Sequence, residues 1–192
     1  MGGSLFLSRS RRAPTRDQRG SVTSDVRLHG DRVVLRPSTE QDLPRFASIL
    51  QTPEVSAWWG LPSTPDALRH EVFADDIVTF AIEVDGATVG LIQCHEETTP
   101  GYRSAGIDIA LAPEHQGQAL GVDALRTMAR YLFDERGHHR LTIDPATTNE
   151  RAIVCYRKVG FRPVGVMREY EQGADGTWHD GLLMDLLRRE LA

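Results

Sequence analysis

Apolar positions along the chain follow two different spacings, which together predict a domain built from strands and helices. Short apolar runs predict strands at 32–36, 79–84, 87–92, 105–111, 140–144, 161–171 and 178–188. Apolar residues spaced three and four apart predict helices near 39–50, 64–73, 120–132 and 149–158. We expect these alternating elements to form a mixed α/β sheet flanked by helices.

Residues with strong turn or capping preferences mark several of these boundaries. Asp85-Gly86 lies between two apolar runs and predicts a tight hairpin turn. Ser38 or Thr39 can cap the first helix, and Gly160 is placed to end the last one. The sequence therefore predicts a hairpin over 79–92 and well-defined ends for two of the helices.

The first 25 residues differ in character from the rest of the chain. They contain five arginines, two aspartates and scattered serines, without apolar periodicity, which predicts a disordered Arg-rich tail at 1–25. A targeting peptide is the alternative, but no apolar segment follows Arg11-Arg12, as export would need. The remaining residues, 26–192, suit one domain with a sizeable core. No apolar run reaches the roughly 18 residues of a membrane-spanning helix.

The charge balance of the folded part favours a cationic partner. Without the tail, 17 basic residues stand against 25 acidic ones, a net charge of −8. Such a surface repels nucleic acid and attracts cations, although acidic surfaces also serve solubility. Cys94 and Cys155 form neither a disulfide framework nor a metal cluster, and His138-His139 has no spaced companions, so we expect a cytoplasmic protein without a metal.

Residues 106–121 join a strand to a turn that suits an anion. Asp108 interrupts an otherwise apolar strand, and the glycine-containing turn at 116–121 leads directly into a helix. Backbone N–H groups at such a turn point at a negative ligand, and the helix dipole assists. The turn has neither the dinucleotide-binding nor the Walker spacing. Taken alone, it fits an ordinary turn as well as a binding site.

Two motifs resemble those of the GNAT superfamily of N-acetyltransferases. Gln116-x-x-Ala119-x-Gly121 is similar to the loop that grips the pyrophosphate of coenzyme A, and Asn149-x-Arg151-Ala152-Ile153-x-Cys155-Tyr156-x-Lys158-x-Gly160-Phe161 resembles the second signature. The resemblance covers about residues 30–188. It implies a GNAT fold, with a twisted, mostly antiparallel sheet that is splayed at the acetyl-CoA site. The family usually has glycine where this chain has Ala119. We expect somewhat weaker cofactor affinity, with alanine tolerated if its φ is negative.

The resemblance also implies a reaction and its residues. Acetyl-CoA would be the cosubstrate, and its acetyl group would pass directly to an amine without an acyl-enzyme. Asp108 would be the base or ammonium anchor and Tyr156 the acid at sulfur, while Cys155 is expected to be a buried small residue. The residues expected to bind the cofactor are Ile109, Ala110, Leu111, Gln116, Gly117, Gln118, Ala119, Leu120, Gly121, Asn149, Ala152 and Tyr156.

Three segments resemble a narrower group, the aminoglycoside 6′-N-acetyltransferases. They are Trp58-Trp59-Gly60, Gly106-Ile107-Asp108 and the stretch from Asp144-Pro145 to Phe161. The resemblance implies a polycationic acceptor, an aminoglycoside antibiotic, whose acetylation at the 6′-amine would confer resistance. The two tryptophans would form a flat wall for its sugar rings. The expected substrate-binding residues are Trp58, Trp59, Glu96, Glu97, Asp108, Asp144 and Asp180. Glu96 and Glu97 are expected in a loop before the Asp108 strand.

Other functions remain open on the sequence. Trp178-His179-Asp180 and the strand after it resemble the ribosomal-protein N-terminal acetyltransferases. A protein N-terminus or a siderophore hydroxylysine is therefore an alternative acceptor. A non-catalytic acyl-CoA-binding sensor is the alternative from another class, favoured by Ala119 and opposed by the presence of Asp108 and Tyr156. We expect a monomer or a homodimer, with neither nucleic acid nor membrane as a partner.

Overall fold

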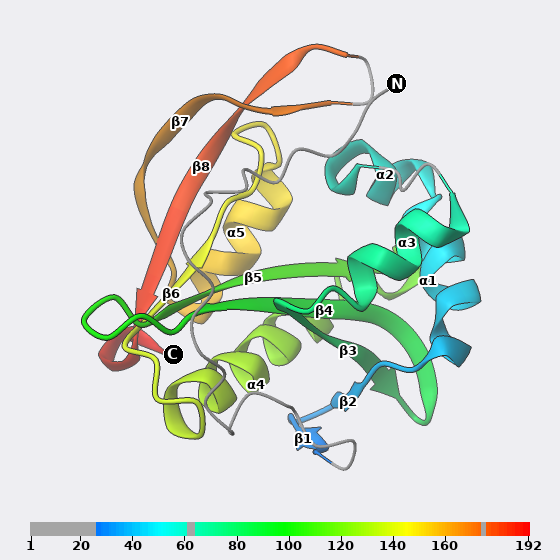
Figure 1. Ribbon diagram of the computed structural model, residues 1–192, viewed down its shortest axis with the longest axis horizontal. Helices are drawn as coiled ribbons and strands as arrows, with labels where there is room; N and C mark the ends of the chain where they lie inside the picture. Colours follow the sequence, from blue (N-terminus) through cyan, green and yellow to red (C-terminus); the bar gives the residue numbers. More distant parts are fainter. Residues whose placement is uncertain (1–25, 61–63, 174–175) are drawn as a thin grey trace.

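The computed structural model describes residues 26–60, 64–173 and 176–192, so the tail predicted at 1–25 lies outside the described residues. One eight-stranded sheet runs through the protein in the order β1-β2-β3-β4-β5-β6-β8-β7 (Figure 1). The strands are β1 (Leu28–His29), β2 (Val34–Pro37), β3 (Ile77–Val84), β4 (Ala87–Glu97), β5 (Ser104–Leu111), β6 (Arg140–Ile143), β7 (Arg162–Gln172) and β8 (Trp178–Leu187). Among the strands of the described residues only β5 and β6 pair in parallel, which confirms the mixed, mostly antiparallel sheet.

In the described residues, five α-helices cover the two faces of the sheet. The helices α1 (Leu43–Leu50), α2 (Pro53–Trp59) and α3 (Pro65–Val72) pack on one face, around a core cluster that includes Phe46, Leu91 and Ala110. The helices α4 (Leu120–Asp134) and α5 (Glu150–Val159) cover the other face, around the larger core cluster. Short 3-10 turns occur at η1 (Glu40–Asp42), η2 (Pro113–His115) and η3 (Arg188–Glu190).

The predicted turn at Asp85-Gly86 and the predicted helix end at Gly160 are both present. Thr39, one of the two residues predicted to cap the first helix, is the N-cap of η1, which leads into α1. The cap at Asn149 was not predicted. Asp85 and Gly86 both have positive φ, at 50° and 80°, the backbone that a two-residue hairpin between β3 and β4 requires. The Asn149 side chain caps α5 by accepting a hydrogen bond from the Ala152 N–H at 3.1 Å. Gly160 ends the same helix with a φ of 117°, and a Cβ there would lie 2.1 Å from the Glu190 carbonyl oxygen.

Three elements differ from the sequence prediction. The two-residue strand β1 and the helix α2 were not expected, since both are too short for a clear apolar period. The strand β4 continues to Glu97, so Glu96 and Glu97 lie in a strand and not in a loop. Pairing with Ala105 and Ser104 of β5 extends the strand through these two carboxylates.

The sheet opens between its two halves. β5 pairs with β6 only at Ala105 and Gly106, so the edge of β5 from Ile107 to Leu111 has no paired strand on that side. On its other side β6 pairs with β8, and β5 and β8 diverge from the region of β6 (Figure 1). This splay leaves backbone groups of β5 available beside Asp108.

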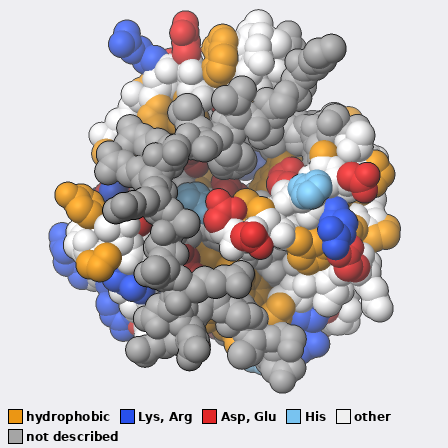
Figure 2. Space-filling view, in the orientation of Figure 1, with side chains coloured by type: hydrophobic (Ala, Val, Ile, Leu, Met, Phe, Trp, Pro, Cys, Tyr) orange, Lys and Arg blue, Asp and Glu red, His pale blue; other side chains and the backbone are white. Residues whose placement is uncertain are grey.

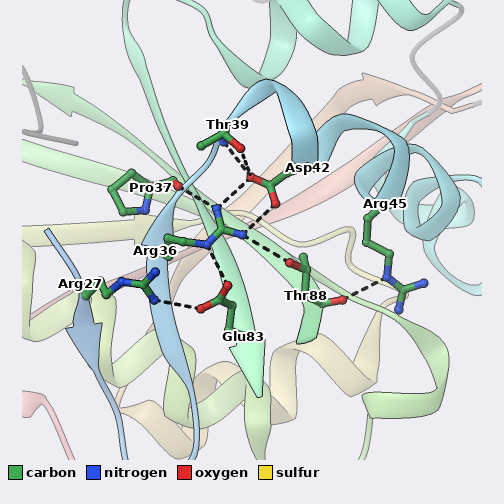
Figure 3. A network of polar contacts seen from close by, with 8 residues as sticks. All are labelled: Arg27, Arg36, Pro37, Thr39, Asp42, Arg45, Glu83 and Thr88. Atoms are coloured by element: carbon green, nitrogen blue, oxygen red, sulfur yellow. Dashed lines mark hydrogen bonds and ion pairs between the residues drawn. The ribbon is translucent and has the colours of Figure 1, made fainter. Parts of the chain in front are cut away.

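A charged network fastens the first strands to α1. Figure 3 shows the Arg36 guanidinium between two carboxylates, with hydrogen bonds of 2.8 Å and 2.9 Å to Asp42 and of 2.8 Å to Glu83. Arg27 adds a second bond to Glu83, at 3.1 Å. Burial raises the pKa of Asp42, but the Arg36 guanidinium stabilises the ionised carboxylate, so the pKa lies below its usual value. The network is structural and lies in the β2–β3 half of the sheet.

Candidate active site

Asp108 lies in the middle of β5, beside the splay, on the sheet face that α1, α2 and α3 cover. Its strand neighbours Ile107 and Ile109 pack into the opposite core, with α4, whereas Ala110 belongs to the α1–α3 cluster. Side chains alternate along a strand, so Asp108 shares the face of Ala110. Gly106 and Ala110 are buried on this face and Asp108 is partly exposed. The aspartate therefore faces an opening in a covered surface.

The Asp108 carboxylate has no hydrogen-bond donor among the residues that the structure describes. Its oxygens are also absent from the buried polar atoms that lack a partner, so they keep contact with solvent. An unpaired, largely buried carboxylate is costly unless a cation joins it. The arrangement suits the binding of a positively charged group by the Asp108 carboxylate.

Acidic side chains surround Asp108. Burial raises the pKa of Asp108 to about 7, and neighbouring negative charges add to the rise. In order of effect those charges belong to Asp144, Glu71 and Glu171. Acidic side chains are visible near the middle of the face in the space-filling view, where β4 and β5 lie in Figure 1 (Figure 2). We call Asp108, Asp144, Glu71 and Glu171 the carboxylate cluster.

Helix α3 brings Glu71 over this face of the sheet. The Gln93 side chain, opposite Asp108 on β4, donates to the Glu71 carbonyl oxygen at 3.4 Å and to the Thr79 hydroxyl at 3.0 Å. The Glu71 carboxylate accepts a 2.7 Å hydrogen bond from Nε1 of Trp59. Burial raises the pKa of Glu71, and the Trp59 bond lowers it in part.

The two tryptophans end α2, and Trp59 contacts the residues of this face. Trp59 is half-buried and packs against the α1–α3 cluster while its indole orients Glu71. Trp58 is 43% exposed, so an aromatic surface remains open. Helix α2 contacts β5, which carries Asp108.

From the other side of the splay, β7 and the end of β6 contribute the remaining members of the cluster. Asp144 directly follows β6, and the Tyr170 hydroxyl on β7 donates a hydrogen bond to it. The Tyr170 ring lies across β8 at Gly181, where a Cβ would come within 2.8 Å of the ring. Gly181 is therefore required for Tyr170 to reach Asp144.

Tyr156 lies on α5 with its ring buried and packed against Phe161, at a centroid distance of 6.2 Å. Among the described residues its hydroxyl has no hydrogen-bond partner, yet the oxygen is not enclosed. Burial raises the pKa of Tyr156 above its usual range, and the charges of Cys155, Asp108 and Asp144 add to the rise. The phenol is therefore protonated at neutral pH and reaches the region of Asp108.

The turn predicted to bind the cofactor phosphates, residues 116–121, lies at the N-terminus of α4. Gln116 donates 2.7 Å to the Leu111 carbonyl oxygen, which ties the loop to the end of β5. Gly117 has a φ of 76°, and nothing lies within 4 Å of a Cβ placed there, so the loop borders open space. The first N–H groups of α4 have no acceptor within the helix. Open space, free donors and a helix N-terminus fit the phosphates of coenzyme A.

Ala119 departs from the sequence expectation. Its φ is +64°, in the left-handed region, and not negative as proposed for a tolerated alanine. A residue with a Cβ is strained there by about 1–2 kcal/mol, whereas glycine is not. The alanine is therefore held in the backbone that glycine usually supplies.

Other predicted site residues have different surroundings. The Leu120 side chain is buried in the core, so only its backbone can face a ligand, and Ala110 is buried as well. Ile109 and Leu111 are partly buried at the end of β5, and Gln118 donates 2.8 Å to the Glu114 carbonyl oxygen. Cys155 lies beside the start of α4, and burial raises the pKa of its thiol.

Glu96 and Asp180 do not join the carboxylate cluster. Glu96 shares the face of Cys94, opposite to that of Asp108, and its carboxylate is bound by Arg136 at 2.8 Å and His138 at 2.5 Å. These partners outweigh burial and lower the pKa of Glu96 to about 2. Asp180 accepts a 2.8 Å hydrogen bond from the N–H of Glu169, a residue with positive φ. Both carboxylates have partners within the protein and lie outside the carboxylate cluster, so their predicted contact with substrate stays a prediction.

Glu97 also differs from the expectation of a loop residue. It is exposed at the far end of β4, four residues beyond Gln93, and accepts a 2.8 Å bond from the Thr99 N–H. The sequence missed Glu71, Gln93, Tyr170 and Glu171. Gln93 could have been found, because a polar residue in an apolar strand is the signal that marked Asp108. Glu71 and Glu171 carry no such signal.

Within the described residues, no helix is both long and apolar enough to cross a membrane. No group of three or more histidine, cysteine, aspartate or glutamate side chains in this part of the chain is arranged to hold a metal ion.

Comparison with known proteins relates the chain to one family. The acetyltransferase (GNAT) domain family matches residues 32–162. The aminoglycoside N(6′)-acetyltransferase type 1 of Klebsiella pneumoniae is 32% identical over 164 residues, which cover 75% of this chain and 81% of the relative. The spermidine N(1)-acetyltransferase of Escherichia coli K12 is 25% identical, over 82% of this chain and 87% of the relative.

The fold has solved counterparts as well. A structure of AAC(6′)-Ib in complex with ribostamycin and coenzyme A superposes with a TM-score of 0.70 and 26% identity, over 83% of this chain and 96% of that chain. Another structure of AAC(6′)-Ib contains acetyl-CoA.

Proposed function

The chain belongs to the GNAT acetyltransferase family, and on this premise we propose that it acetylates the 6′-amino group of aminoglycoside antibiotics. The family relation makes it an acetyl-CoA-dependent N-acetyltransferase that needs no metal. The acceptor is the part that we propose.

One observation carries the proposal: the unpaired Asp108 carboxylate lies among three other acidic side chains of the carboxylate cluster. Like charges at this density repel one another, and a ligand with several ammonium groups would relieve the repulsion. An N-terminal peptide offers one ammonium group at the reacting end, whereas an aminoglycoside offers several. The similarity to the Klebsiella enzyme supports the same choice.

Asp108 would bind the reacting ammonium group and take its proton, directly or through a water. A general base works best with a pKa near the working pH, and the pKa of Asp108 is about 7. An arriving ammonium group favours the carboxylate form, so binding itself would prepare the base. The amine is then a free nucleophile at the splay.

Bound acetyl-CoA supplies the acetyl group as a thioester. The free edge of β5 from Ile107 to Leu111 would offer backbone N–H groups to the carbonyl oxygen. Tyr156, still a phenol at neutral pH, would hold the proton for the departing sulfur. No residue of the chain needs to form a covalent bond, which agrees with a protonated Cys155 thiol.

Spermidine is a second candidate acceptor. A linear polyamine also carries several ammonium groups, and a spermidine acetyltransferase is among the relatives. The exposed ring of Trp58 and the oriented ring of Trp59 favour an acceptor with flat sugar rings over a thin, flexible chain. We therefore place aminoglycosides first.

Thiol release from acetyl-CoA would be measured with a kanamycin-type aminoglycoside, spermidine, hydroxylysine and an N-terminal peptide. The proposal expects the highest kcat/KM with the aminoglycoside. Expression in a susceptible bacterium should raise its minimal inhibitory concentration. Turnover with the peptide alone would exclude the antibiotic as acceptor, and coenzyme A binding without turnover of any amine would favour the sensor function.

A further inference from the structure

We propose that Arg32 and Arg151 hold the phosphate groups of acetyl-CoA, one from each side of the loop at 116–121. The inference rests on the acetyl-CoA dependence of the family and not on the identity of the acceptor. It assigns a role to two side chains that lie far apart in the sequence.

Arg32 reaches the loop from the turn between β1 and β2. Its guanidinium donates a 2.7 Å hydrogen bond to the Gln118 carbonyl oxygen, although 86 residues separate the two. The side chain is exposed, so its other N–H groups face solvent at the N-terminus of α4. The planar guanidinium can bind a carbonyl and a phosphate at the same time.

The backbone of Arg32 is fixed to the helix that receives the phosphates. The Asp123 carboxylate, in the first turns of α4, accepts N–H bonds from Asp31 at 2.9 Å, Arg32 at 2.7 Å and Val33 at 3.0 Å. Gly30 allows this approach, because a Cβ there would lie 2.6 Å from the Asp123 carboxylate. Asp123 is therefore a positioning residue for Arg32.

Arg151 reaches the loop from the opposite side. It lies in the first turn of α5, is exposed, and donates a hydrogen bond to the Gln116 side-chain oxygen. Gln116 in turn binds the Leu111 carbonyl oxygen. The two arginines thus hold alternate residues of one loop, with the strained Ala119 between them and the helix.

The charges of the region point to an anionic ligand. Neither Arg32 nor Arg151 has a carboxylate partner among the described residues. Both are exposed, and both lie on a protein with more acidic than basic residues. Acetyl-CoA is a polyanion, and an acidic protein needs local cations to bind it. Two unpaired arginines at the phosphate loop meet that need.

Binding of coenzyme A would be measured by isothermal titration calorimetry on the full chain, for wild type, Arg32→Gln and Arg151→Gln. A charge-assisted hydrogen bond is worth about 1.5–3 kcal/mol, so each substitution should weaken binding roughly 10-fold or more. The loss should shrink at high salt, because salt screens exposed charges. Arg32→Lys should recover part of the affinity, since it restores the charge.

Arg130→Gln is the matched control. Arg130 is exposed on α4, ten residues beyond the start of the helix, and its loss changes the net charge equally. Binding by Arg32→Gln and Arg151→Gln within twofold of the control would overturn the proposal, as would a loss that salt leaves unchanged. Thermal unfolding of each variant shows whether loss of the arginine's bond to the loop has destabilised the fold. An unchanged Tm assigns the weaker binding to the lost phosphate contact. Failure to acetylate aminoglycosides leaves these binding results valid.

Discussion

Gln93 and Asp108 face each other across β4 and β5, but the Gln93 amide donates away from Asp108, to the Thr79 hydroxyl and the Glu71 carbonyl oxygen. The nearest amide on the neighbouring strand is thereby occupied, and Asp108 keeps an unpaired carboxylate. The first two predictions below follow from that state of Asp108.

Asp108→Asn should lower kcat/KM by roughly 100-fold or more, the usual effect of removing a general base. The wild-type pH profile of kcat/KM should fall below about pH 7, where Asp108 takes up its proton, and the variant should lack this limb. Steady-state kinetics across pH give both readouts. An unchanged rate in the variant would make Asp108 a bystander.

The same substitution should stabilise the protein at alkaline pH. The folded-state pKa of Asp108 is raised from its usual 3.8 to about 7, so ionising it costs folding free energy as pH rises between these values. Asn carries no charge, and the variant should gain roughly 1–2 kcal/mol, or about 2–8 °C in Tm, at pH 8. Near pH 4 the two proteins should unfold alike. Equal Tm values at both pH would mean that Asp108 is not destabilised by its neighbours.

Tyr156→Phe should lower kcat by about 100-fold while the KM for the acceptor stays close to wild type. The phenol is expected to protonate the leaving sulfur, and loss of a general acid typically costs 10²–10⁴-fold. Phe keeps the ring packed on Phe161, so the fold should be preserved. Stopped-flow or steady-state thiol release measures the effect, and wild-type kcat in the variant would remove Tyr156 from the chemistry.

Glu71→Gln should raise the KM for a polycationic acceptor roughly 10-fold with the KM for acetyl-CoA unchanged. Glutamine can still accept the Trp59 hydrogen bond, so the change removes charge and leaves the wall in place. Asp75→Asn is the control, because Asp75 is exposed just after α3. Equal KM values for the two variants would show that Glu71 does not face the acceptor.

Glu96→Gln should destabilise the protein without altering any KM. Its pKa is lowered from its usual 4.5 to about 2, so its ionised form stabilises the fold above pH 4.5 and the effect fades as pH falls toward 2. Loss of the bonds to Arg136 and His138 should cost about 2–3 kcal/mol near pH 7. Urea unfolding at neutral and acidic pH tests this. A raised acceptor KM would return Glu96 to the substrate site.

The sequence predicted most of the sheet and the turn at 116–121 that leads into α4, because these features depend on local pattern. The Asp85-Gly86 turn and the helix end at Gly160 both follow from the backbone preferences of these residues. The acceptor side was predicted only in part. Glu71 and Glu171 come to Asp108 through the packing of α3 and β7, and Glu96 leaves it because strand alternation turns it to the other face.

The φ of Ala119 shows the same limit within the loop. Sequence spacing identified the loop, but only the folded chain shows that alanine occupies the left-handed backbone, with Gln118 fastened to Arg32 beside it. No local signal connects residue 32 to residue 118, because the contact depends on how β1 and β2 pack against α4.

The central claim is that the carboxylate cluster directs a 6′-amine of an aminoglycoside to Asp108. The most direct measurement compares two aminoglycosides that differ only in a 6′-amine or a 6′-hydroxyl, with the acetylated nitrogen located by NMR of the product. The account predicts acetylation of the first at the 6′-nitrogen and no turnover of the second. Equal turnover of both compounds, or an acetyl group on any other nitrogen, would contradict it.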